Sequence, residues 1–378
     1  MDYARVVDEI FSQIKGVRFA VRLWDGRKRE YGSGRKRAFT LVFHSELAAK
    51  RLLSQGSLGF GECYMDGSLQ VEGSLANYLE LRHKFKKVKP SAYMTAAAVL
   101  AKRTIPKDTA SQISYHYDLG NDFFKLLLDK KTMSYSCGLF ESGKETLVQA
   151  QQNKLKLVCD WLDLPPGSKV LDLGCGWGGF ATYAAAKRGW HITSCTLSKE
   201  QLRYCEKLVA RKGLESQIKL KYIDMLRELP GGQFDAIVML ESIEHVGKKR
   251  LNGFIEKLYA SVKPGGVVYI QTSGRYQPKS LDKWTLKYVF PGGHLPSQQE
   301  LVDDATQAGF KLTSFVDDAP SYVKTIDAWT HNLADNKKQV EAMFDESTYR
   351  LWELWTLGAK VGFEVGSMGL FRIKLTRP

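Results

Sequence analysis

A strand that runs directly into a glycine-rich turn and then a helix is the feature that most restricts the fold of this chain. It reads Lys169-Val-Leu-Asp-Leu-Gly-Cys-Gly-Trp-Gly-Gly-Phe180. Its glycines let the backbone turn sharply and approach a ligand before the helix starts. Turns of this kind lie at the carboxyl end of a strand in a parallel sheet that helices cover. The segment therefore predicts an α/β fold with a ligand site at that edge.

The rest of the chain after Ile113 supports this fold class. Helical stretches alternate with short apolar runs in units that suit a mostly parallel sheet. A long Gly- and Pro-containing insertion lies between Ser273 and Pro296, and its length predicts a lid or a wall of the substrate site. We predict seven strands, at residues 169–173, 191–195, 218–222, 234–240, 267–272, 311–316 and 371–375.

The region before Ile113 has a different pattern. Residues 19–72 alternate β-like runs with Gly-rich turns, and residues 92–102 form a short Ala-rich helical stretch. A length of 378 residues suits two domains. We predict a smaller mixed α/β domain at 1–102, a linker at 103–112 and a catalytic domain at 113–378.

Most of the positive charge lies in this N-terminal part. The whole chain has 55 Lys and Arg against 41 Asp and Glu, a net charge of +14, and residues 1–112 contribute +9 of it. Such a surplus draws a protein toward polyanions. The basic clusters 27–29, 35–37 and 82–89 suit either a solvated face, as most charge runs do, or a surface that lies on anionic phospholipid. Composition alone favours the solvated face.

Location is predicted from what the sequence contains. The longest stretches without charged residues, 173–186 and 90–101, are shorter than the about 20 apolar residues of a membrane-spanning helix. The start of the chain lacks the apolar block of a secretory signal, and the six cysteines form no C-x-x-C pair. We expect reduced thiols, a cytoplasmic protein, and membrane contact only as a peripheral protein at the inner face.

The acidic residue before the glycine-rich turn indicates which class of cofactor the turn binds. Asp172 gives the spacing D-x-G-x-G-x-G, which resembles motif I of class I S-adenosylmethionine methyltransferases. A nicotinamide-binding loop more often reads G-x-G-x-x-G, with an acid at the end of the second strand. The second strand here ends in Thr196-Leu197-Ser198. The spacing therefore disfavours a nicotinamide cofactor.

Six segments in one order carry a closer resemblance. They are YHYDLGNDFF at 115–124, MSYSCGLF at 133–140, the glycine-rich turn, TLSKEQ at 196–201, IEHVG at 243–247 and YVFPGG at 288–293. Together they resemble the cyclopropane-fatty-acid-phospholipid synthases and their mycolic-acid relatives, strongly over residues 114–329 and loosely before them. The resemblance implies a class I methyltransferase fold. It also implies transfer of a methylene unit from S-adenosylmethionine to the cis double bond of an unsaturated phospholipid at the membrane surface.

The resemblance also implies which residues bind S-adenosylmethionine. They lie at strand ends and in the turns that follow: Tyr135, Ser136, Asp172, Gly174, Gly176, Thr196, Leu197, Gln201, Asp224 and Met225. Backbone N–H groups after Gly176 can receive the methionyl carboxylate. Gln201 can bind the ribose in place of the missing acid.

The reaction itself restricts the catalytic residues. Methyl transfer to an unactivated double bond creates a carbocation, so the site must exclude water and then remove a proton. The resemblance implies that the base is a bicarbonate ion, held by the backbone beside a Cys, and by a Glu, a His and a Tyr. The matching residues here are Cys137, Glu244 and Tyr322, and we expect burial to raise the pKa of Glu244.

One part of the expected site departs from the family. Where relatives read H-T-I on the fifth strand, this chain has Gln271-Thr272-Ser273. A Gln side chain can donate to an anion, but it cannot carry charge or shuttle a proton. Bicarbonate would then bind more weakly or differently, or be replaced by water.

Several functions stay open at this point. Cyclopropane formation is the preferred interpretation, and methyl- or methylene-branching by the same cation is the second. The retained cofactor loop and Glu244 disfavour a non-catalytic lipid-binding module. The family motifs disfavour a small-molecule or an RNA methyltransferase, and no aromatic-rich RNA motif is present. We expect no nucleic-acid partner and no metal ligand set, and a homodimer is left open.

Overall fold

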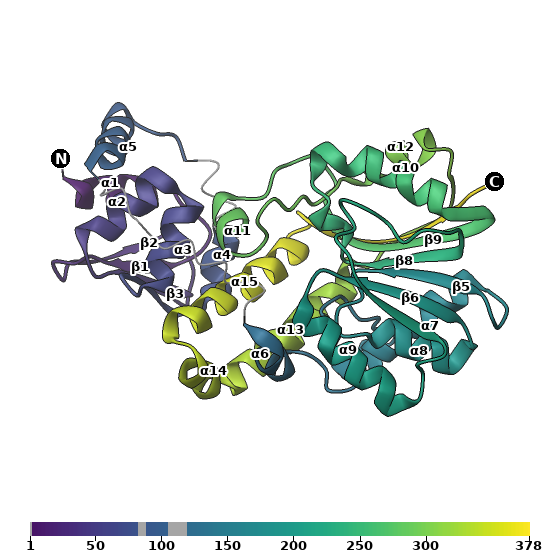
Figure 1. Ribbon diagram of the computed structural model, residues 1–378. Helices are drawn as coiled ribbons and strands as arrows, with labels where there is room; N and C mark the ends of the chain where they lie inside the picture. Colours follow the sequence, from purple (N-terminus) through teal and green to yellow (C-terminus); the bar gives the residue numbers. More distant parts are fainter. Residues whose placement is uncertain (1, 82–87, 105–118) are drawn as a thin grey trace. The chain divides into compact units, whose positions relative to one another are not determined.

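The computed structural model describes residues 2–81, 88–104 and 119–378, and the chain divides into two compact units (Figure 1). The first unit contains Met1–Asp118, Asp282–Pro291 and Leu333–Val361. The second unit contains Leu119–Leu281, Gly292–Asn332 and Gly362–Pro378. The predicted linker at 103–112 lies largely outside the described residues.

The second unit is built on a seven-stranded sheet. Its order is β10-β11-β9-β8-β5-β6-β7. The pairs β9–β8, β8–β5, β5–β6 and β6–β7 are parallel, whereas β11 pairs antiparallel with both β9 and β10. The strands are β5 (Lys169–Leu173), β6 (His191–Thr196), β7 (Ile218–Tyr222), β8 (Phe234–Leu240), β9 (Val262–Gly274), β10 (Lys311–Asp317) and β11 (Gly369–Thr376). All seven predicted strands are therefore confirmed, and so is the mostly parallel α/β fold.

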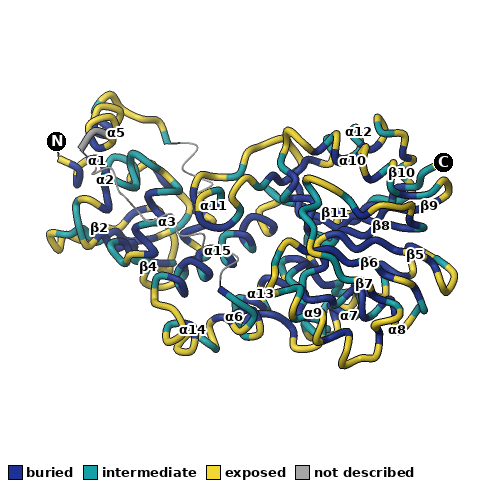
Figure 2. The backbone as a smooth tube through the Cα atoms, in the orientation of Figure 1, coloured by how far each residue is buried: buried dark blue, intermediate teal, exposed yellow. Residues whose placement is uncertain are grey.

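Two hydrophobic clusters cover the two faces of this sheet. One includes Phe254 of α10 and Leu301 of α12, and the other includes Val158 of α7, Phe180 of α8 and Val209 of α9. The central strands β5, β8 and β9 lie between these layers, and most of their residues are buried (Figure 2). The helices of this unit are α6 (Gly120–Leu127), α7 (Leu147–Leu162), α8 (Gly179–Arg188), α9 (Lys199–Lys212), the 3-10 helices η2 (Ile243–His245) and η3 (Lys248–Arg250), α10 (Leu251–Ser261), α12 (Gln298–Gln307) and α13 (Ala319–Asp335).

The first unit contains a four-stranded sheet of order β2-β1-β3-β4. Its strands are β1 (Phe19–Arg22), β2 (Lys28–Tyr31), β3 (Phe39–Phe43) and β4 (Leu69–Gly73), and the predicted helix at 92–102 is present as α5 (Ala92–Thr104). The sequence prediction missed β2, because Lys28 and Arg29 belong to a basic cluster. β2 is an exposed edge strand, where charged side chains hinder pairing with other chains. The other helices in the N-terminal part of the first unit are α1 (Tyr3–Phe11), α2 (Glu46–Gln55), α3 (Ser57–Met65) and α4 (Leu75–Leu81).

Two later segments pack into this first unit. They contain α11 (Lys283–Tyr288), α14 (Lys337–Met343) and most of α15 (Glu346–Glu364). Trp284 of α11 packs on Gly61, where a Cβ would lie 2.1 Å from the indole ring. The predicted insertion at 273–296 is therefore partly a component of the first unit.

In the described part of the chain no helix is both long enough and apolar enough to cross a bilayer. All six cysteines are buried free thiols.

Candidate active site at the carboxyl edge of the sheet

The glycine-rich turn after β5 has one crowded and one open position. Gly174 and Gly176 have φ of 82° and 53°. A Cβ on Gly174 would lie 2.5 Å from the Cβ of Ser242, whereas nothing lies within 4 Å of a Cβ placed on Gly176. Gly178 provides no side-chain cap for the first N–H groups of α8. The turn therefore leaves room for a ligand at Gly176, and the uncapped helix start suits a carboxylate.

The end of β6 provides a second set of polar groups. The Thr196 hydroxyl donates to Oε1 of Gln201 at 2.8 Å, and Ser198 caps α9 by accepting from the Gln201 N–H. The bond from Thr196 occupies the side-chain oxygen of Gln201. The side-chain N–H groups of Gln201 therefore remain to bind a ribose hydroxyl. Leu197 is 58% exposed and offers an apolar surface at the same strand end.

The acidic residues predicted at the cofactor site lie in different environments. Asp172 is buried, and its Oδ2 accepts from the Ser194 hydroxyl at 3.1 Å. Burial raises the pKa of Asp172 to about 7. Asp224 accepts from the N–H of Leu226 at 3.0 Å, and the neighbouring Met225 packs against the cluster under α10. Asp172 thus links β5 to β6 below the glycine-rich turn, while Asp224 binds the backbone of the loop after β7.

Tyr135 and Ser136 precede Cys137 and are held by a different set of contacts. The Tyr135 ring packs at 5.1 Å from that of Trp329. The Ser136 hydroxyl accepts from Nζ of Lys154 at 2.7 Å. Burial lowers the pKa of Lys154 to about 8. A buried lysine therefore lies beside the segment that carries Cys137.

The expected anion contacts converge on Glu241, a residue that the sequence prediction did not include. Its Oε1 accepts from the backbone N–H of Cys137 at 2.7 Å and from Nε2 of Gln271 at 2.8 Å. Its Oε2 accepts from the hydroxyl of Tyr322. Three of the predicted site residues thus surround one carboxylate of the protein itself.

The backbone of Glu241 is unusual as well. Its φ is 57°, in the left-handed region that L-residues rarely adopt. Its N–H donates to the carbonyl oxygen of Gln271 at 2.7 Å, which fixes the turn after β8. A non-glycine residue in this conformation costs of order 1–2 kcal/mol, and such strain is concentrated at functional sites.

Accessibility separates Glu241 from its donors. Cys137 and Gln271 have no exposed surface, and Tyr322 is 8% exposed, whereas Glu241 is only partly buried. Burial raises the pKa of Glu241, although Tyr322, Cys137 and Gln271 all stabilise its charged form. Glu241 is therefore the member of this cluster that keeps some exposed surface, while its donors are buried.

Glu244 lies in a second, drier position. Its Oε1 accepts from the N–H of Ser273 at 2.8 Å, while its Oε2 is buried with no hydrogen-bond partner among the described residues. Burial and the nearby charge of Glu241 raise the pKa of Glu244 to about 8. Ser273 thus contributes its backbone, as an apolar residue there would. Glu241 and Glu244 disfavour each other's charge, and the raised pKa of Glu244 keeps this second carboxyl group neutral beside Glu241 at neutral pH.

Sequence reasoning missed Glu241, Lys154 and the buried Arg372, which binds Gln271. Glu241 follows the buried strand β8 and stands three positions before Glu244, so an acid at a strand end was a usable signal. The lysine and the arginine gave none, because a single basic residue in a helix or a strand is ordinarily a surface residue.

The chain matches the family model of mycolic acid cyclopropane synthetase over residues 105–373. It belongs to this cyclopropane synthetase family. A second model, for a domain of unknown function, matches residues 6–89.

Individual members of the cyclopropane synthetase family resemble the chain over most of its length. A probable fatty acid methyltransferase of Pseudomonas putida is 32% identical over 95% of this chain and 91% of that protein. The cyclopropane-fatty-acyl-phospholipid synthase of Escherichia coli is 31% identical over 87% of this chain and 85% of that protein. The crystal structure of a mycolic acid cyclopropane synthase complexed with SAH and CTAB has a TM-score of 0.66 at 30% identity, and covers 72% of this chain and 99% of that one.

Membership of the cyclopropane synthetase family gives the class of reaction. The protein is an S-adenosylmethionine-dependent methyltransferase, and the chemistry of its relatives is cyclopropane formation or methyl transfer on lipid acyl chains. The fold and the glycine-rich turn suit this assignment, and Glu241 and its donors lie at the same edge of the sheet.

Proposed function

We propose that this enzyme transfers a methyl group from S-adenosylmethionine to the cis double bond of an unsaturated phospholipid acyl chain, and that Glu241 is the base that follows. The observation that carries this proposal is the position of the Glu241 carboxylate, which accepts from Cys137, Gln271 and Tyr322. These residues are the ones expected to hold an external anion. A carboxylate of the chain therefore takes the place of bicarbonate.

The methyl donor fits the turn and the strand ends described above. Open space at Gly176 and the uncapped start of α8 suit its carboxylate, and Gln201 and Leu197 suit its ribose and base. Asp224 and Tyr135 complete the set of proposed contacts. When bound, S-adenosylmethionine supplies an electrophilic methyl group.

The balance of the reaction requires one base. The alkene carbon forms a bond to the methyl carbon as the bond to sulfur breaks, which leaves S-adenosylhomocysteine and a cation on the other alkene carbon. Glu241 then takes a proton from the new methyl group, and the electron pair of that C–H bond closes the cyclopropane ring. Protonated Glu244 is a neutral neighbour, so its own charge does not compete with Glu241.

A methylene-branched product is the second candidate. A hydride shift before proton loss would move the cation to the carbon that bears the methyl group, and loss of a methyl proton would then give an exocyclic double bond. A base fixed at the end of β8 cannot move along the cation as a free anion can, so the proton within its reach decides between the two products. The Pseudomonas putida relative is described as a probable fatty acid methyltransferase, which favours keeping this candidate.

The substrate lies in a membrane, and we propose that the enzyme acts as a peripheral protein on its cytoplasmic face. The basic surplus of residues 1–112 supports attraction to anionic phospholipid. The residues 82–87 of the third basic cluster lie outside the described residues. No nucleic-acid partner is proposed, and a homodimer stays a prediction from the sequence.

The test is a product assay with and without bicarbonate. The enzyme is incubated with S-adenosylmethionine and vesicles of an unsaturated phospholipid in bicarbonate-free buffer, and acyl products are identified by proton NMR. The ring and the methylene branch have equal mass, so NMR is needed to separate ring protons from terminal alkene protons. We expect full turnover without bicarbonate. A requirement for added bicarbonate would contradict Glu241 as the base.

A further inference from the structure

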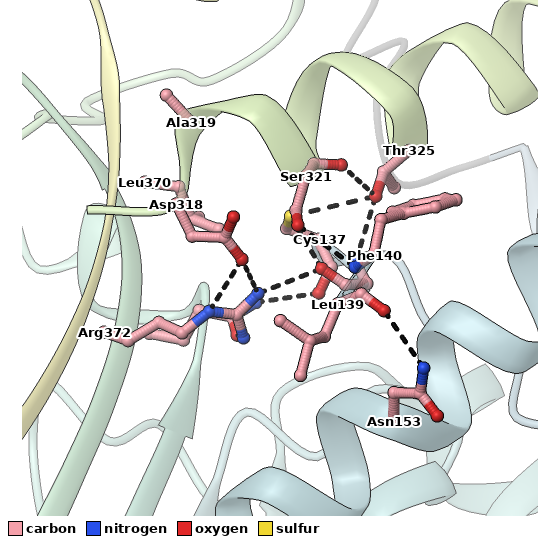
Figure 3. Close-up of polar contacts among 12 residues, drawn as sticks. Cys137, Leu139, Phe140, Asn153, Asp318, Ala319, Ser321, Thr325, Leu370 and Arg372 are labelled. Carbon is pink, nitrogen blue, oxygen red and sulfur yellow. Dashed lines mark hydrogen bonds and ion pairs between the residues drawn. The ribbon is translucent and has the colours of Figure 1, made fainter. Parts of the chain in front are cut away.

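Arg372 on β11 is a buried cation that contacts all three segments from which Glu241 receives its hydrogen bonds. It is 1% exposed and lies opposite Gln271, in the antiparallel pair that β11 forms with β9. The close-up in Figure 3 shows its guanidinium group between Asp318 and the segment that contains Cys137 and Phe140. A buried arginine is costly unless every N–H finds a partner.

The first contact orients Gln271. Nη1 of Arg372 donates to Oε1 of Gln271. Nε2 of the same amide donates to Oε1 of Glu241 at 2.8 Å and to the carbonyl oxygen of Cys137 at 3.0 Å. Because a guanidinium group can only donate, it must face the amide oxygen, and the N–H groups must then face Glu241. Arg372 thereby determines which end of Gln271 meets the carboxylate.

The other contacts reach the segments of the two remaining donors. Nη2 of Arg372 donates to the carbonyl oxygen of Gly138 at 2.9 Å, next to Cys137, whose N–H binds Glu241. Nη2 also pairs with Asp318 at 2.8 Å, just before α13. This helix carries Tyr322, the third donor to Glu241. One side chain thus joins β9, the segment after Tyr135 and the start of α13.

We infer that Arg372 is a positioning residue that acts through Gln271, Gly138 and Asp318 to hold the donors of Glu241 in place. This inference rests on the proposed role of Glu241 as the base. Arg372 itself has no contact with the reacting atoms in this scheme, and its guanidinium group is covered by the residues it binds.

The expected consequence is a change in turnover with little change in binding. Without Arg372 the Gln271 amide can turn over and present its oxygen to Glu241, which would repel the carboxylate and raise its pKa. The other charged or titratable groups near Glu241 are Tyr322 on α13, Glu244 on η2, Lys154 on α7 and the Cys137 thiol, and they are unchanged in such a variant. The acidic limb of the pH–rate profile should therefore move to higher pH.

The test compares Arg372→Met, Arg372→Lys and a control, Arg377→Met, in the full-length enzyme. Arg377 follows the same strand but donates to the carbonyl oxygens of Tyr259 and Val262. For Arg372→Met we expect kcat to fall about tenfold or more, which corresponds to about 1.4 kcal/mol of activation free energy, with unchanged affinity for S-adenosylmethionine. Arg372→Lys, which can keep one of the contacts, should recover part of the loss. Arg377→Met should leave the pH–rate profile in place.

A folding defect is separated from a positioning defect by a second variant. Removing Arg372 alone leaves Asp318 without its buried partner, so the double variant Arg372→Met with Asp318→Asn removes the pair together. It should fold and still show the shifted profile. A folded variant with normal kcat and an unmoved acidic limb would overturn the role of Arg372.

The outcome for Glu241→Gln keeps the two proposals distinguishable. If that variant loses activity while both Arg372 variants keep the wild-type profile, the base assignment stands and the positioning role of Arg372 fails. If Glu241→Gln keeps normal turnover, the base assignment itself fails.

Discussion

The backbone N–H of Cys137 donates to the carboxylate of Glu241 at 2.7 Å, across 104 positions of sequence. The contact joins the segment after α6 to the end of β8. It gives Cys137 a role that needs only its backbone, and burial raises the pKa of its thiol well above the ordinary value. A neutral, buried thiol is not a nucleophile in this site.

Replacing Glu241 should remove the base without removing the fold. We expect Glu241→Gln to lower kcat by about a hundredfold or more, the usual scale for loss of a general base. The smaller Glu241→Gly variant leaves the donors around an empty position, so added formate, acetate or bicarbonate should restore part of its activity. Initial rates with each anion provide the measurement. Glu241→Gln serves as the control, because its amide still fills the space and should not respond to the anions.

The backbone of residue 241 should reverse the ordinary preference for alanine over glycine. At φ 57° a Cβ is strained, so Glu241→Gly should be more stable than Glu241→Ala by about 1 kcal/mol. In the interior of α9, the exposed Lys207 should behave the other way, with Ala more stable than Gly by about 1 kcal/mol. Urea unfolding of the four variants gives both differences. Equal or reversed stabilities at position 241 would show that its backbone is not strained.

The protonation of Glu244 should appear in the pH dependence of stability. Its folded pKa of about 8 lies above the ordinary value of 4.5, so the folded protein keeps a proton that the unfolded chain has lost. The free energy of unfolding should therefore fall as pH rises from about 4.5 to about 8 and then level off. Glu244→Gln should remove this part of the slope, as measured by urea unfolding across that range.

Glu300 offers a control of opposite sign for this measurement. There the N–H of Ser297 and the Lys248 ion pair outweigh burial and lower the pKa to about 2. Its stabilisation is present above pH 4.5 and should be lost as pH falls toward 2. Glu300→Gln should therefore flatten only the acidic part of the curve. If the free energy of unfolding of Glu244→Gln kept the wild-type slope between pH 4.5 and 8, the group with the raised pKa would not be Glu244.

The glycine-rich turn can be tested with two glycines of similar geometry. Gly176 and Gly213 have φ of 53° and 65°, and a Cβ on either would meet nothing within 4 Å. Gly176→Ala and Gly213→Ala should therefore cost similar stability. Only Gly176→Ala should weaken binding of S-adenosylmethionine, by about tenfold or more, since about 1.4 kcal/mol of lost contact corresponds to that factor. Calorimetric titration of both variants makes the comparison, and equal affinities would remove Gly176 from the site.

Attraction of the first unit to anionic lipid should depend on salt and on its own basic residues. Arg35 and Lys36 are exposed in this unit. Sedimentation with anionic phospholipid vesicles should decrease at high salt, because the Debye length shortens. It should also decrease for Arg35→Gln with Lys36→Gln. The same charge change at Lys207 and Arg211 on α9 is the control. Salt-independent sedimentation, or equal losses in both double variants, would contradict a basic lipid-binding face in the first unit.

The sequence by itself determined the sheet and the position of the site on it. The runs that became β5, β7 and β8 were predicted with the observed bounds. Burial on both faces makes the central strands β5 and β8 largely apolar, whereas the edge strand β7 alternates apolar residues with Lys219 and Lys221. The glycines after β5 placed the ligand edge, since absent side chains are a local requirement. The family resemblance grouped Cys137, Gln271 and Tyr322 as expected contacts of one anion, and this role stays a prediction.

Only the tertiary structure brought the Glu241 carboxylate to these three groups and showed which side chain holds them in place. The Glu241 carboxylate reaches them because its φ of 57° turns the chain after β8, and no periodicity in the sequence signals a left-handed residue. Arg372 meets Gly138 across 234 positions, through a strand order that places β11 beside β9. Local sequence patterns indicate which residues are apolar and which turns need glycine. Strand order and side-chain geometry determine which residue pairs with a buried charge, and they exist only once the sheet has formed.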